Sequence, residues 1–213
     1  SLICSTGMGK VFFANSGAEA NEGMIKLARK YSFDKYGEGR SRIITLKQSF
    51  HGRTVTTLKA TGQDKFHQYF FPFTEGFDYV TPGNIEEMEE KLDDSVCAVM
   101  LELIQGEGGV LPLDQEFVKE TEKICRKKDI LLLIDEVQTG IGRTGTLFCY
   151  EQYGISPDVV SAAKGLGGGL PIGAVIASEK CGDVLGAGTH GTTFGGNPLC
   201  CAAADTVLSI INT

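Results

Sequence analysis

The run I-L-L-L-I-D-E, residues 130–136, decides the fold class. Five consecutive apolar residues suit a strand that is covered on both faces, which is typical of parallel sheets. Comparable patterns predict strands at residues 10–14, 42–46, 97–101, 130–135, 159–162 and 174–177.

Helical patterns alternate with these strands. Ser16 and Glu19 have the spacing of a capping box and open a segment that runs to about Tyr36. Asp114 is a candidate N-cap for a helix over 115–128, and 85–92 is a third helical segment. The alternation predicts one α/β domain of three layers built on a mostly parallel sheet.

Composition argues against several classes of function. The 213 residues suffice for one sizeable domain, and the net charge of −7 disfavours a nucleic-acid partner. Since no window reaches the roughly 18 to 20 apolar residues of a membrane span, we expect no membrane segment. The seven cysteines lack a C-x-x-C motif, and the three histidines lack ligand spacing. We therefore expect reduced thiols, a cytoplasmic location and no metal site.

In open α/β sheets, ligands bind beyond the carboxyl ends of the strands. Here those ends read S-G-A-E, S-F-H-G-R-T, E-L-I-Q-G-E-G-G, D-E-V-Q-T-G and A-K-G-L-G-G-G. They hold most of the charged and glycine residues that chemistry could use.

Three of these strand ends suggest one ligand, although each has a plainer interpretation. The helix start at 14–21 offers an anion site, or is only a helix start. Asp135 needs a cationic partner, caps a following helix, or belongs to a Walker B strand, although no Walker A motif is present. Lys164 is a desolvated nucleophile or a solvated surface lysine. A phosphate, a basic ring nitrogen and an aldehyde together describe pyridoxal phosphate. The glycines that follow Lys164 would let the pyridoxal ring and the substrate lie against the chain.

The runs S-G-A-E-A-N-E, S-F-H-G-R-T, I-Q-G-E-G-G-V, L-L-I-D-E-V-Q-T-G-I-G-R-T-G, A-A-K-G-L-G-G-G-L-P-I-G-A and H-G-T-T-F-G-G-N-P-L, in this order, resemble the class III aminotransferases. The resemblance covers essentially the whole chain. It implies a fold-type I pyridoxal-phosphate-dependent transferase large domain that acts as a homodimer with shared active sites.

The resemblance also implies a role for individual residues at the cofactor. Lys164 is the Schiff-base lysine and moves the proton during catalysis, while Asp135 keeps the ring nitrogen protonated. Gln138 lies near the phenolic oxygen of the ring, and Phe50 stacks on its face. The residues expected at the phosphate are Ser16, Gly17 and Ala18, together with Thr193 from the neighbouring subunit.

For the substrate, the resemblance implies that Arg53 binds a carboxylate, that Glu107 lies near the entrance, and that Thr192 approaches the substrate of the neighbouring subunit. It assigns no chemistry to Glu19 and Glu102. Arg143 is interpreted as structural.

The implied reaction converts N-acetylornithine and 2-oxoglutarate to N-acetylglutamate semialdehyde and glutamate, as in arginine biosynthesis. Other donors remain open: ornithine, succinylornithine, 4-aminobutyrate or an aminomutase substrate. A non-catalytic nucleotide-binding module is the alternative from another class. We expect residues 1–213 to be the cofactor-binding large domain of a longer enzyme, without the family's N-terminal segment and C-terminal small domain, and therefore to turn over poorly.

Overall fold

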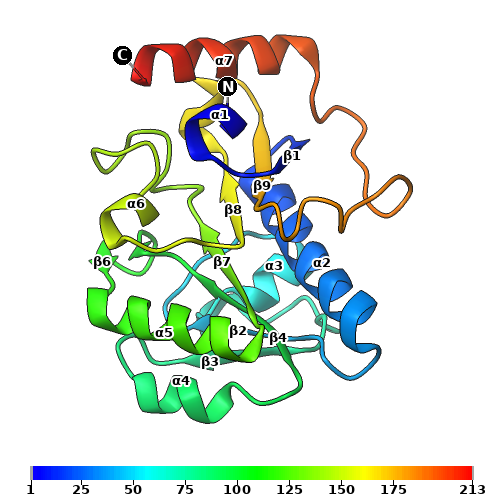
Figure 1. Cartoon of the computed structure of the whole chain (residues 1–213), viewed down its shortest axis with the longest axis vertical. Coiled ribbons are helices and arrows are strands. Elements are labelled where there is room, and N and C mark those ends of the chain that lie inside the picture. The colour runs from blue at the N-terminus through cyan, green and yellow to red at the C-terminus, as the bar shows by residue number, and fades with distance from the viewer. Residues whose placement is uncertain (1, 213) are drawn as a thin grey trace.

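The computed structural model describes residues 2–212 and contains a seven-stranded sheet in the order β1-β9-β8-β7-β4-β2-β3 (Figure 1). Within these residues β9 is the one strand of this sheet that runs opposite to the other six, so the prediction of a mostly parallel sheet is confirmed. The strands are β1 (Lys10–Ala14), β2 (Arg42–Leu46), β3 (Phe77–Val80), β4 (Val96–Leu101), β7 (Leu131–Asp135), β8 (Val159–Ala162) and β9 (Gly173–Ala177).

All the predicted strands are present, and the sequence missed β3. This strand lies at the edge of the sheet and pairs only with β2. Its sequence F-D-Y-V is only partly buried, so it lacks the continuous apolar run that marks the central strands. A two-stranded ribbon of β5 (Ile104–Gln105) and β6 (Leu111–Pro112) was also missed.

Three helices were predicted and are confirmed: α2 (Gly17–Tyr36), α4 (Ile85–Lys91) and α5 (Gln115–Lys128). The expected caps are present, because Ser16 accepts from the Glu19 N–H and Asp114 accepts from the Phe117 N–H. The remaining helical elements are α1 (Leu2–Thr6), α3 (Val55–Ala60), α6 (Tyr150–Tyr153), α7 (Pro198–Ile211) and the 3₁₀ turns η1 (Asp64–Phe66) and η2 (Lys164–Gly167).

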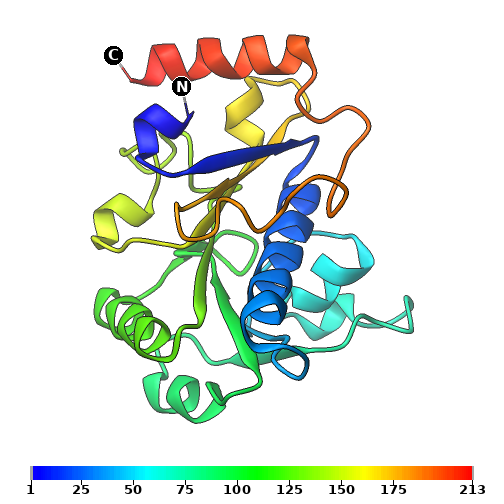
Figure 2. The same cartoon turned by 45° about the vertical axis from the view of Figure 1, so that its right-hand side comes forward.

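Helices cover both faces of the sheet, with α2 on one side and α4 and α5 on the other (Figure 2). Successive residues of β7 divide between the two cores: Leu131 and Leu133 pack with the apolar face of α2, and Leu132 and Ile134 pack with that of α5. This alternation follows from the two-residue period of a strand. The apolar run of residues 130–134 is therefore buried from both sides.

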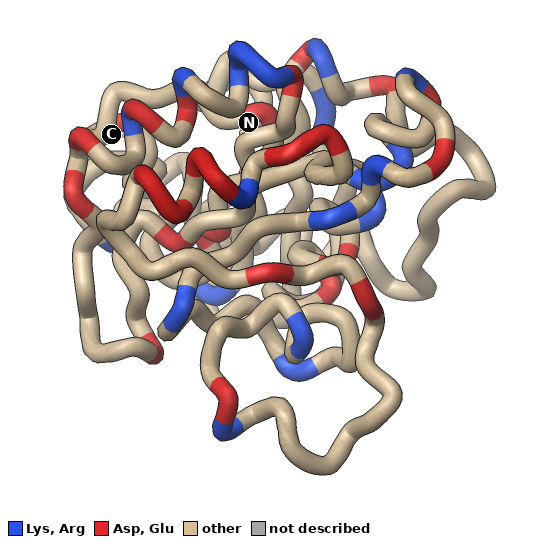
Figure 3. Tube along the Cα trace, turned by 90° about the horizontal axis from the view of Figure 1, so that it is seen from below, with Lys and Arg blue, Asp and Glu red and all other residues tan. Residues whose placement is uncertain are grey.

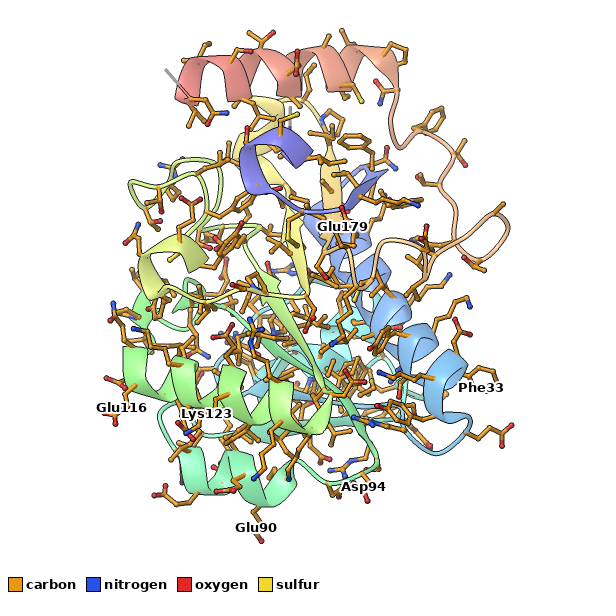
Figure 4. The ribbon with its side chains drawn as sticks, in the orientation of Figure 1. Phe33, Glu90, Asp94, Glu116, Lys123 and Glu179 are labelled. Atoms are coloured by element: carbon orange, nitrogen blue, oxygen red, sulfur yellow. The ribbon has the colours of Figure 1, made fainter. Side chains whose placement is uncertain are left out.

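The outer faces of α4 and α5 carry charge of both signs (Figure 3). Glu90 on α4, and Glu116 and Lys123 on α5, project away from the sheet (Figure 4). Among the described helices none is long and apolar enough to cross a membrane. All seven cysteines are unpaired.

Candidate active site

A cavity of about 610 Å³ opens at the carboxyl edge of the parallel strands. Because β1, β2, β7 and β8 are parallel, the segments that follow them meet there, and the chain entering antiparallel β9 closes one side. Most of the residues predicted for cofactor and substrate line this cavity: Ser16, Gly17, Ala18, Phe50, Arg53, Asp135, Gln138 and Lys164.

Asp135 lies at the end of β7 with only 4% of its surface exposed. One carboxylate oxygen, Oδ2, accepts from Asn21 Nδ2 at 2.7 Å and lies 2.8 Å from His51 Nδ1. The other, Oδ1, accepts from the Val137 N–H at 3.0 Å. No helix begins here, since turns follow Glu136, so Asp135 is not a helix cap. Its carboxylate is fixed by groups from α2, from the segment after β2 and from its own turn.

Burial and neighbouring charges together shift the pKa values of the groups around Asp135. Burial opposes a charge on His51, but the bond to Asp135 and its negative charge outweigh this effect, so the pKa of His51 is raised. Burial raises the pKa of Glu102 to about 7; the charge of His51 acts against this and that of Asp135 adds to it. Glu102 Oε2 also accepts from the Phe50 N–H at 2.7 Å. The cavity floor thus holds two carboxyl groups and one imidazole, with His51 Nε2 buried and without a partner among the described residues.

Lys164 begins η2 in the left-handed region, with φ of 44°. A side chain there is strained, which is common at functional positions. Its ammonium donates to Gln138 Oε1 at 2.5 Å. Of the two interpretations left open for Lys164, the described residues fit the solvated one, because its side chain is exposed. Gln138 is packed so closely against Gly106 that a Cβ there would lie 2.0 Å from its Nε2.

The start of α2 presents free backbone donors to the cavity. Gly17 and Ala18 occupy the first turn, where N–H groups have no intrahelical acceptor, and neither N–H is bonded within the described chain. A Cβ on Gly17 would lie 2.6 Å from Val137, so glycine allows the helix to approach the turn after β7. The positive end of the helix dipole adds to the attraction for an anion.

Most of the glycines after Lys164 do not line the cavity, although we expected them to make room for a ligand. Among Gly165, Gly167, Gly168 and Gly169, only Gly169 lines the cavity. A Cβ on Gly167 would lie 2.9 Å from Ile172, and one on Gly168 would lie 3.0 Å from Val207 of α7. Close packing between segments therefore explains those two positions.

Three predicted residues lie outside this cavity. Glu107 is exposed in the turn between β5 and β6. Thr192 and Thr193 line a separate hollow beside α2, where Thr192 Oγ1 accepts from Asn15 Nδ2 at 3.0 Å. Arg143 is exposed, and its side chain makes no hydrogen bond or ion pair within residues 2–212, so no structural contact is found for it.

His51 and Asn21 were not predicted as partners of Asp135, and Glu102 had no predicted role. Both His51 and Asn21 belong to motifs that the sequence already singled out, and both are buried. Their burial was the missing signal, because a buried polar side chain needs a partner. In the described part of the chain, no cluster of His, Cys, Asp or Glu is arranged to hold a metal ion.

Comparison with known proteins gives one consistent family. The sequence profile of aminotransferase class-III matches residues 1–213. The chain is 56% identical to the acetylornithine aminotransferase of Haemophilus ducreyi over 98% of this chain and 53% of that protein. It is 49% identical to the succinylornithine transaminase of Photorhabdus laumondii over 99% of this chain and 52% of that one.

A solved structure is similar throughout the described fold. It is the ornithine aminotransferase of Toxoplasma gondii with partial occupancy of PLP at its active site, with a TM-score of 0.94, 37% identity, and coverage of 99% of this chain and 51% of the other. The chain spans about half the length of the relatives that it matches. The ordered motifs, the fold and these similarities show that the chain belongs to the class III aminotransferases.

Proposed function

We propose that this chain is the pyridoxal-phosphate-binding domain of an aminotransferase that takes the amino group of N-acetylornithine and delivers it to 2-oxoglutarate. The observation that carries the proposal is one cavity lined by the buried carboxylate of Asp135, the ammonium of Lys164 and the free amides of Gly17 and Ala18. The name of the Haemophilus ducreyi relative supports the choice of donor.

The donor set suits the chemistry of pyridoxal phosphate. The amides at the start of α2 match a phosphate, a buried carboxylate matches a protonated ring nitrogen, and a lysine amine matches an aldehyde. When bound, the cofactor supplies an aldehyde for amines and a ring that withdraws electrons from the carbon that loses a proton. Phe50, half-buried at the cavity wall, offers an aromatic face, and Gln138 offers an amide beside Lys164.

The chain's own residues divide the remaining work. Asp135 holds a proton at the ring nitrogen, and its own position is fixed by His51 and Asn21. Lys164 Nζ would take a proton from the donor carbon that bears the amino group and, as its conjugate acid, would deliver it to C4′ of the cofactor, so it would serve as general base and then general acid. Arg53 at the rim binds the substrate carboxylate with its planar, bidentate guanidinium.

Further parts of the proposal concern the assembly. We place Thr192 and Thr193 at the active site of a second copy, consistent with their exposed position outside the cavity. Glu107 lies at the substrate entrance, and residues 1–213 are the large domain of a longer, cytoplasmic enzyme that acts as a homodimer. The relatives' greater length is consistent with this domain assignment.

A donor screen tests the reaction. The chain is saturated with pyridoxal phosphate, and each donor is added in turn while loss of the bound cofactor's visible absorbance is followed. We expect N-acetylornithine to react with the highest kcat/KM, N-succinylornithine next, and ornithine and 4-aminobutyrate slowly. The succinylornithine relative, at 49% identity, makes the second compound the sharpest competitor.

Two controls complete the screen. Lys123→Ala, at an exposed lysine whose ion pair within residues 2–212 is with Glu120, should react like the wild type, whereas Lys164→Ala should not react. Equal rates for all donors, or a response to ATP in place of pyridoxal phosphate, would reject the proposed function in favour of a broader enzyme or a nucleotide-binding module.

A further inference from the structure

Arg53 stands at the rim of the cavity with its guanidinium free of protein carboxylates. Its side chain is exposed, and within residues 2–212 it forms no ion pair or hydrogen bond. Two other arginines, by contrast, form ion pairs: Arg42 pairs with Asp78 and Asp93, and Arg126 pairs with Glu122. The Arg53 guanidinium contacts an aromatic ring, with Cζ 5.8 Å from the centroid of Phe66. Lys65 contacts the same ring, with Nζ 5.0 Å from its centroid.

Phe66 is well placed to act on the site because its segment is tied to the chain after β2. Residues 61–63 bond to residues 49–51 through three contacts of 3.0 Å: His51 N–H to Thr61 Oγ1, Gly62 N–H to Ser49 Oγ, and Gln63 Nε2 to the Ser49 carbonyl. The turn η1 begins at once and ends at Phe66. These bonds fix the position of the Phe66 ring relative to Phe50 and Arg53, because both residues belong to the chain segment that follows β2.

The Phe66 ring contacts Phe50 as well as Arg53. It meets Phe50, a wall of the cavity, edge-on, with the two centroids 5.7 Å apart and an interplanar angle of 67°. Such edge-to-face pairs are favourable and define relative orientation. One half-buried ring thus joins the aromatic wall of the cavity to the cation at its rim.

An aromatic ring and a carboxylate hold an arginine in different ways. A carboxylate partner occupies N–H donors of the guanidinium and neutralises it. A ring face attracts the cation through its quadrupole and leaves the N–H groups, which lie in the guanidinium plane, available for a bidentate acceptor. Held by Phe66, Arg53 keeps both its charge and its donors for a ligand.

We propose that Phe66 is a positioning residue that presents Arg53 to the carboxylate of the substrate. The inference rests on the proposed function and deepens it, because it names a side chain that sets the affinity for carboxylate-bearing substrates without touching them. It requires no movement of the chain and no further ligand.

The test replaces the ring while keeping apolar volume. In Phe66→Leu, glutarate, an unreactive dicarboxylate analogue of 2-oxoglutarate, should bind about two- to fivefold more weakly, which corresponds to an exposed cation–π contact. The KM for 2-oxoglutarate should rise by the same factor while kcat stays unchanged, the signature of lost uniform binding. Phe66→Tyr, which retains a ring, should restore both values.

The matched control is Phe73→Leu. Phe73 also contacts a cation, with Lys59 Nζ 6.0 Å from its ring centroid. Its ring partners His67 and Phe71 and this lysine do not line the cavity, whereas the partners of Phe66, Phe50 and Arg53, do. Glutarate affinity and KM should remain at the wild-type values in this variant. Thermal unfolding of both leucine variants identifies any general loss of structure, which would affect kcat as well as KM.

A double-mutant cycle decides whether Phe66 acts through Arg53. In an Arg53→Gln background, Phe66→Leu should have no further effect on glutarate affinity. Wild-type affinity in Phe66→Leu, an equal loss in the Arg53→Gln background, or failure of Phe66→Tyr to restore binding would overturn the inference while leaving the role of Arg53 intact. If Arg53→Gln alone binds glutarate like the wild type, the carboxylate site of the proposed function fails, and this inference fails with it.

Discussion

The two ends of β7 each carry an aspartate, and their surroundings differ in kind. Asp129, just before the strand, is 27% exposed and accepts from Lys35 at 2.7 Å and Tyr36 at 2.6 Å, while Lys180 lies 3.0 Å away. Asp135, at the other end, is 4% exposed, and within residues 2–212 no lysine or arginine lies within ion-pair distance of it.

The difference separates structure from chemistry. Burial acts to raise the pKa of Asp129, but the bonds from Lys35, Tyr36 and Lys180 outweigh it and hold that pKa well below its usual range. The protein has already compensated this charge. At Asp135 the only basic side chain within bonding distance among residues 2–212 is the imidazole of His51, so a cationic ligand in the cavity would find an oriented carboxylate with little compensation.

The largest effect should come from removing the charge at the cavity end. Asp135→Asn keeps the size of the side chain and an acceptor for the Val137 N–H but loses the negative charge. We expect the rate of the donor half-reaction to fall by about a hundredfold or more, because a preorganised charge at the reacting group is lost. Asp129→Asn in the same assay should react at nearly the wild-type rate. Similar rates for the two variants would remove the distinction between the ends of β7.

A second prediction uses the carboxyl group beside Asp135. The pKa of Glu102, raised from 4.5 to about 7, implies a contribution to stability that is present below 4.5 and lost as the pH rises through about 7. Glu102→Gln removes this dependence, so its stability relative to the wild type should improve by about 1–3 kcal/mol between acidic and mildly alkaline pH. Urea unfolding at both pH values measures the difference.

Glu136→Gln is the companion control for that experiment. Burial raises the pKa of Glu136 to about 7 as well, while bonds from Thr139 and from the backbone act against the rise. Glu136 faces Thr139 and the Tyr150 N–H and does not line the cavity. The two variants should show the same pH trend, but only Glu102→Gln should alter the absorbance of the bound cofactor. A flat pH response in Glu102→Gln relative to the wild type would contradict the assigned environment.

The smallest effect is expected at the opposite end of the strand. Asp129→Asn keeps a residue that tolerates the left-handed backbone there, with φ of 50°, and loses only the charge. We expect a loss of about 1 kcal/mol in the free energy of unfolding, since the partners are partly exposed. Because the folded pKa of Asp129 is depressed, this contribution exists above the unfolded pKa and disappears as the pH falls below about 4.

Acid unfolding of Asp129→Asn should therefore be less steep than that of the wild type. Asp94→Asn, an exposed position without a hydrogen bond or ion pair within residues 2–212, serves as the reference. If Asp94→Asn and Asp129→Asn lose equal stability, the network around Asp129 contributes nothing.

The sequence could predict what is local. The apolar run of β7 and the caps Ser16 and Asp114 depend on neighbours within a few residues, and these elements were predicted to within a residue. The position of the site at the carboxyl ends of the strands then followed from the rule for open α/β sheets. The edge strand β3 was not predicted. It pairs with β2 at the edge of the sheet, is only partly buried and therefore lacks a continuous apolar run.

The contacts that complete the site are not local, which is why they were missed. His51 and Asn21 reach Asp135 across 84 and 114 residues of sequence, and nothing near Asp135 indicates which buried polar groups will face it. The left-handed backbone of Lys164 and its exposure likewise depend on how η2 packs against β9 and α7. The Phe66 contact with Arg53 is closer in sequence, but it requires the turn η1 to bring the ring back.

Covalent capture of pyridoxal phosphate tests most directly whether this cavity binds the cofactor through Lys164. The chain is incubated with the cofactor, reduced with borohydride and digested, and the labelled peptide is identified by mass spectrometry, with Lys164→Ala and Asp135→Asn treated in parallel. The account predicts a single label on Lys164, absent in Lys164→Ala and formed with lower cofactor affinity in Asp135→Asn. A label spread over surface lysines, or none on a chain whose circular dichroism shows it folded, would contradict the assignment of this cavity to pyridoxal phosphate.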